Sequence, residues 1–109
     1  MGLFGNSETQ NKKDAILRDI TVINKALRDI GSLLDKGMNV SSVNSCSSII
    51  ENMESNINRV STTIQGMSDS ELSGFTVPWM DGRYLGIMMW ITTFQMVMNK
   101  TINEMEKVH

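Results

Sequence analysis

Apolar residues recur along the first third of the chain at the spacing of a heptad-patterned helix. Successive members are four or three residues apart, and the series consists of Ile16, Ile20, Ile23, Leu27, Ile30 and Leu34. This spacing places all of them on one side of an α-helix, whereas a half-buried strand would need strict alternation. Because Gly37 follows Lys36 as a C-terminal stop signal, we predict a helix over about 9–36.

A second heptad pattern follows without an intervening proline. Its members are three or four residues apart and consist of Val43, Cys46, Ile50, Met53, Ile57, Val60, Ile64 and Met67. The pattern predicts a helix over about 41–67. Ser41 or Ser42 is a suitable N-cap. Ser48 and Glu51, however, have the spacing of a capping box, so the position of the first turn stays open.

The last predicted helix, over about 83–107, is apolar on almost every side. One heptad seam, interrupted only by Gln95, contains Tyr84, Met88, Ile91, Met98, Ile102 and Met105. Further apolar side chains occupy the other faces, and no charged residue lies between Tyr84 and Met98. Two neighbouring helices cover only part of such a circumference. We therefore expect an exposed apolar strip at which the protein pairs with itself or with a partner.

Residues 68–82 form the one long connection that the pattern leaves between the predicted helices. They contain Pro78 and an Asp81-Gly82 pair, both of which are typical of turns. The stretch 75–80 is nevertheless rich in large apolar side chains. Such a segment either caps one end of a helical bundle or forms a tip that binds a partner.

Together these elements predict one helical domain over residues 1–109, a length typical of single domains. The expected fold is all-α, an antiparallel three-helix bundle with coiled-coil-like heptad packing that is completed by oligomerisation. The loop 68–82 would then join the second and third helices of this bundle.

Composition and charge exclude several classes of protein. The chain is 40% hydrophobic, which is enough for a packed core, and its single Cys excludes a disulfide framework. A net charge of −2 without a basic cluster argues against a nucleic-acid partner. The apolar run 84–98 is shorter than the roughly 20 residues that cross a bilayer. No secretory signal is visible, so we expect a cytoplasmic location.

Residues that carry chemistry are few. Cys46 lies in a heptad seam, where a thiol acts as a small buried hydrophobic group. Glu106 and His109 have a spacing that places two metal ligands on one helix face, but a metal-binding bundle needs more such pairs. We expect no catalytic residue, no metal site and no cofactor. The ten methionines favour an irregular core or an adaptable binding surface.

The sequence therefore predicts a non-enzymatic helical module for protein–protein interaction or assembly, such as an adaptor, a chaperone-like protein, an inhibitor or immunity protein, or a structural component. It would act through a Met- and Trp-rich face, with a protein partner or a second copy of itself. The expected partner-binding residues are Trp79, Met80, Tyr84, Met88, Trp90 and Phe94. The alternative is a membrane-associated helical protein that uses the apolar helix over 84–98.

Overall fold

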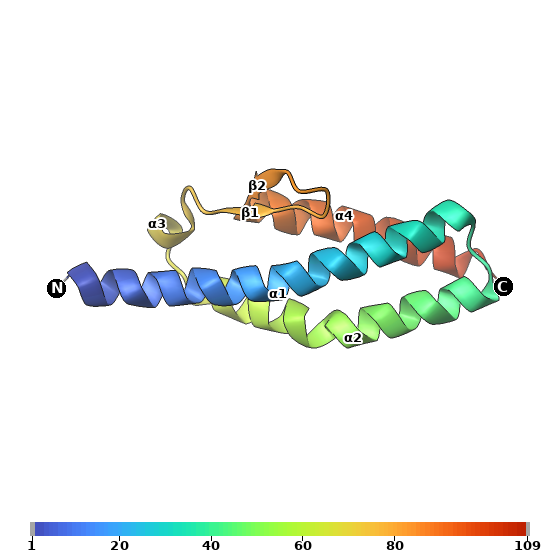
Figure 1. The fold of residues 1–109 in the computed structure, drawn as a ribbon, viewed down its shortest axis with the longest axis horizontal. Helices are drawn as coiled ribbons and strands as arrows, with labels where there is room; N and C mark the ends of the chain where they lie inside the picture. Colours follow the sequence, from blue (N-terminus) through green and yellow to red (C-terminus); the bar gives the residue numbers. More distant parts are fainter. Residues whose placement is uncertain (1, 109) are drawn as a thin grey trace.

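The computed structural model describes residues 2–108, which are mostly helical (Figure 1). The elements in chain order are α1 (Gly2–Lys36), α2 (Val40–Gln65), α3 (Asp69–Leu72), β1 (Thr76–Pro78), β2 (Tyr84–Gly86) and α4 (Ile87–Glu106). α1 and α2 form an antiparallel pair, and α4 lies along this pair and runs in the direction of α1 (Figure 1). The molecule is elongated, with extents of 58 × 23 × 18 Å.

The predicted seam of α1 is confirmed as the centre of the core. Five of its members have no exposed surface, namely Ile16, Ile20, Ile23, Leu27 and Ile30. The helix ends as expected at Lys36, where Gly37 adopts a φ of +96° that favours glycine. Its start differs from the expected residue 9, because α1 continues back to Gly2 through a stretch without proline.

α2 begins at a cap that the sequence analysis did not identify. Neither Ser41, Ser42 nor Ser48 is the N-cap; that position belongs to Asn39. The Asn39 backbone is extended and its side chain accepts a hydrogen bond from the backbone N–H of Ser42, over 2.9 Å. This bond satisfies one of the free N–H groups at the helix start, so α2 begins at Val40.

A polar cluster fixes the register between α1 and α2. Asp19 accepts a hydrogen bond of 2.9 Å from the amide of Asn56 and forms an ion pair of 3.0 Å with Arg59. At the C-terminal end of α2, the Lys12 ammonium donates a hydrogen bond to the backbone carbonyl of Gly66. Residues early in α1 thus meet residues late in α2, as antiparallel packing requires.

The expected loop over 68–82 is instead largely structured. α3 is a single turn whose start has a full capping box: Ser68 accepts from the backbone N–H of Glu71, and Glu71 accepts from that of Ser68. The Ser-x-x-Glu spacing was visible in the sequence but is followed by too few residues for a periodic pattern. Thr9 and Lys12 also contact the Glu71 carboxylate, so α3 is held against α1.

Acid is expected to loosen this junction. Hydrogen bonds from the Ser68 backbone and from Thr9, together with Lys12, lower the pKa of Glu71 from its ordinary value of 4.5 to about 2. A lowered pKa stabilises the fold above the ordinary value, and this stabilisation is lost as the pH falls through about 2. Thermal unfolding of wild type and Glu71→Gln should differ most at neutral pH and converge in acid. A difference that stays constant with pH would contradict this role of the carboxylate.

β1 and β2 form a small antiparallel hairpin, so the all-α expectation is wrong in this detail. Val77 pairs with Leu85 in the ladder, and Gly82 closes the turn with a φ of +92° and a hydrogen bond to the Trp79 carbonyl. Sequence analysis placed this region in a loop and a helix, because each strand has only three residues. Pro78 has no backbone N–H to donate to the ladder. The end of β1 tolerates it because the ladder stops there.

α4 begins at Ile87, after β2, rather than at residue 83 as expected. Its heptad seam is not the buried one, because Tyr84, Met88 and Ile102 are exposed. The side that faces the core instead carries Ile87, Trp90, Phe94, Val97 and Thr101, of which Ile87, Trp90 and Thr101 are fully buried. A helix apolar on nearly every side gives no sequence signal for which of its seams will be covered.

Candidate helix-binding groove

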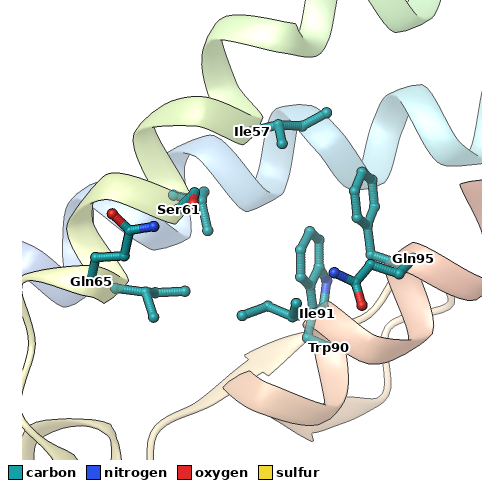
Figure 2. Close-up of a pocket in the computed structure, with 9 residues that line it drawn as sticks. Ile57, Ser61, Gln65, Trp90, Ile91 and Gln95 are labelled. Atoms are coloured by element: carbon teal, nitrogen blue, oxygen red, sulfur yellow. The ribbon is translucent and has the colours of Figure 1, made fainter.

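An apolar groove lies between α2 and α4 (Figure 2). Its volume is about 220 Å³. The lining side chains come from two turns of each helix and are Ile57, Val60, Ser61, Ile64, Gln65, Trp90, Ile91, Phe94 and Gln95. None of them is charged, so the groove is suited to an apolar occupant without charges of its own.

The α4 side of the groove is built on a rigid aromatic cluster. The rings of Trp90 and Phe94 stack with centroids 5.3 Å apart, and Trp79 packs edge-on against Trp90 at 6.1 Å. The Trp90 indole N–H donates a hydrogen bond of 3.2 Å to the side-chain carbonyl of Asn24 on α1. Since the Asn24 amide in turn donates to the Pro78 carbonyl, the hairpin, α1 and α4 are locked together beneath the groove.

The α2 side of the groove contains three successive members of its heptad seam, Ile57, Val60 and Ile64, together with Ser61 and Gln65. Every seventh residue, beginning at Cys46 and including Met53, Val60 and Met67, is buried. The members between them, among which Ile57 and Ile64 line the groove, stay partly exposed. One half of the predicted seam is therefore covered, while the other half forms an edge directed toward α4.

The heptad seam of the last helix includes the α4 edge that borders this groove. Ile91 and Gln95 line the hollow, and Figure 2 shows both directed toward the space between the helices. Met88, Met98 and Ile102 share this edge because they are spaced from these residues by three, four or seven positions. This part of the heptad pattern therefore marks an open edge beside the core.

Of the six expected partner-binding residues, the structure brings Trp79, Trp90 and Phe94 together in the aromatic cluster, but only two of these line the groove. Trp90 and Phe94 line the groove. Trp79 is buried beneath them, and Met80 is half-buried, with its carbonyl accepting a hydrogen bond from Arg28. Tyr84 and Met88 are exposed and do not line the hollow.

The α2 residues Ile57 and Ile64 were missed as site residues. The sequence analysis assigned the whole seam of that helix to the core. They could have been found by comparing the apolar surfaces of the helices. The narrow apolar seam of α1 is too small to bury both the whole α2 seam and the apolar faces of α4, so part of the α2 seam must stay open.

The apolar stretch 75–80 lies mostly inside the fold. Phe75, Val77 and Trp79 are buried in the hydrophobic core. The backbone N–H of Ile87 donates to the Phe75 carbonyl, which joins this stretch to the start of α4. Of the two readings left open by the sequence, the structure places these side chains as a cap on the core.

Groups suited to catalysis or metal binding do not gather in the part of the chain that the structure describes. Cys46 is fully buried, and burial raises the pKa of its thiol, which disfavours the reactive thiolate. No set of three or more His, Cys, Asp or Glu side chains is close enough to hold a metal ion within residues 2–108. Of the Glu106–His109 pair, His109 lies outside the described residues.

Comparison with known proteins gives no relative to guide the assignment. Neither family models, curated proteins nor solved structures contain a match to this chain. Within the described residues, no helix combines the length with the apolar character that crossing a membrane requires.

Proposed function

We propose that this protein is a non-enzymatic helical module for protein–protein interaction or assembly, and that the α2–α4 groove receives the apolar face of an α-helix. The observation that carries the proposal is the groove's lining: two helix edges present uncharged, mainly apolar side chains one turn apart. Helical ligands bind such grooves through side chains at the same spacing.

The arrangement of the helices supports this function. α2 packs antiparallel on α1, and α4 also contacts α1. A helix in the groove would pack against both α2 and α4. Four helices around a common core are a stable packing solution, in which each helix covers the edges of two neighbours. Binding would thus bury Ile57, Ile64 and Ile91, which the single chain leaves partly exposed.

The uncharged lining of the groove limits which helices can bind there. The polar groups at the groove are the neutral side chains of Ser61, Gln65 and Gln95. A charged side chain placed there would lose hydration without finding an opposite charge. The partner helix is therefore expected to be apolar on one face and uncharged along it, with Leu, Ile, Met or Ala as its main contacts.

A matched pair of variants tests the proposal. Ile64→Lys places a charge in the groove, whereas Val22→Lys places one on α1, at an exposed apolar position outside the groove. Both tagged variants and wild type are used to capture proteins from a lysate of the source cells, after circular dichroism has confirmed folding. We expect protein captured by wild type to be retained by Val22→Lys and lost with Ile64→Lys. Equal capture by both variants would refute the groove as the binding site.

A further inference from the structure

The exposed face of α4 has methionine as its apolar residue. Met88, Met89 and Met96 are 56%, 57% and 66% exposed, although large apolar side chains are usually buried. An α-helix turns by about 100° at each residue, so the three side chains share about one third of its circumference. The other methionines that the structure describes are buried or half-buried. The exposed thioethers are thus gathered on one side of a single helix.

The neighbours of these methionines leave the sulfur atoms as the reactive groups of this face. Thr92 and Thr93 lie among them, and their hydroxyls donate to the backbone carbonyls of Met88 and Met89 over 3.1 and 2.8 Å. Both hydroxyls are therefore engaged with the helix itself. The first charged residue of α4 is Lys100, four positions after Met96. A small neutral molecule that reaches this face meets three thioethers.

Packing within the chain does not explain methionine at these positions. An exposed side chain contacts few neighbours, and leucine favours a helix as much as methionine does. What methionine adds is its thioether, which is flexible and can be oxidised. Flexibility suits an adaptable contact surface, whereas oxidation suits a chemical switch. The contrast between three exposed thioethers and the shielded ones of the core favours the second use, because it confines the reaction to one face.

We propose that Met88, Met89 and Met96 are sites of reversible oxidation, at which a peroxide converts the exposed face of α4 from apolar to polar. In this two-electron step a sulfur lone pair attacks one peroxide oxygen and the O–O bond breaks. That oxygen stays on the sulfur as a sulfoxide, and the other leaves with both protons as water. Thiol-dependent reductases reverse the change, since two thiols become a disulfide and the sulfoxide oxygen leaves as water.

The core of the fold is protected from this reaction. Met53 and Met67 are 1% and 8% exposed and belong to the hydrophobic core. A sulfoxide at either position would bury a polar oxygen without a hydrogen-bond partner. A sulfoxide on the exposed face of α4 keeps its oxygen in water. Oxidation therefore changes the surface of α4 while the fold persists.

Treatment of the purified chain with hydrogen peroxide tests the selectivity. Peptide mass spectrometry over time gives the oxidation rate at each methionine, and circular dichroism follows the fold. We expect Met88, Met89 and Met96 to react at about the rate of free methionine, with the helical signal unchanged. Met53 and Met67 should react about tenfold more slowly or less, because the core must open first. Equal rates at the exposed and the buried positions would overturn the proposal.

A second experiment tests whether the reaction is used as a switch. Wild type and the triple variant Met88→Leu, Met89→Leu, Met96→Leu are recovered from the source cells before, during and after exposure to hydrogen peroxide. We expect sulfoxides at the three sites that rise during exposure and fall afterwards. Oxidised wild type should also bind a hydrophobic column less strongly, whereas the triple variant should not change. Sites that stay unmodified in the exposed cells, or that are never reduced again, would overturn the proposal and leave an adaptable contact surface.

Discussion

Trp90→Ala is expected to lower the free energy of unfolding by about 3–5 kcal/mol, the usual cost of truncating a buried aromatic side chain to alanine. Trp90 is 2% exposed and contacts Trp79, Phe94 and Asn24. Its removal leaves a cavity beneath the groove and breaks the contact between α4 and α1. Urea unfolding followed by circular dichroism measures the loss.

Trp90→Phe provides the control for packing. Phenylalanine retains much of the ring contact but lacks the indole N–H that donates to Asn24. We expect a smaller loss than in Trp90→Ala, with an intact fold. If Trp90→Ala costs less than about 1 kcal/mol, Trp90 is not a core residue in solution.

Asn24→Leu is expected to cost about 2–4 kcal/mol, although it exchanges a polar core residue for an apolar one of similar size. Asn24 is 4% exposed, accepts from Trp90 and donates to the Pro78 carbonyl over 2.7 Å. Leucine would leave a buried donor and a part-buried acceptor without partners, and each such group costs about 1–3 kcal/mol. The same unfolding experiment measures this cost.

A double-mutant cycle separates the Asn24–Trp90 hydrogen bond from packing. If the bond couples these residues, Asn24→Leu combined with Trp90→Phe should cost less than the two single changes added together, by about 0.5–3 kcal/mol. Simple additivity would show that the bond contributes little. The result matters for the groove, because this bond holds its aromatic wall against α1.

The helices of the first two thirds were predictable because their pattern is long and regular. Six heptad positions on α1 and eight on α2 define one face each, and the burial of Ile20, Leu27 and Met53 follows. The cap at Asn39 was not predicted, since several serines nearby compete for that position by spacing alone. Which residue becomes the N-cap depends on the direction that the chain takes after Gly37.

The region 68–86 was poorly predicted for a different reason. α3 and the two strands contain four, three and three residues, too few for a period of 3.6 or 2 to become visible. Their stability comes from contacts distant in sequence, such as Thr9 with Glu71 and Asn24 with Pro78. Local propensity contains no information about those contacts.

The candidate groove shows what the sequence determines and what the tertiary structure determines. The sequence by itself determined the helical character, the α1 core seam and the excess of apolar surface on the last helix. Only the tertiary structure decided that Trp90 is buried, and that Phe94, Ile91 and Gln95 border an open groove with Ile57 and Ile64. Apolar side chains all favour burial, but a single chain has too few neighbours to cover every seam. Which edge stays open therefore depends on how the helices pack.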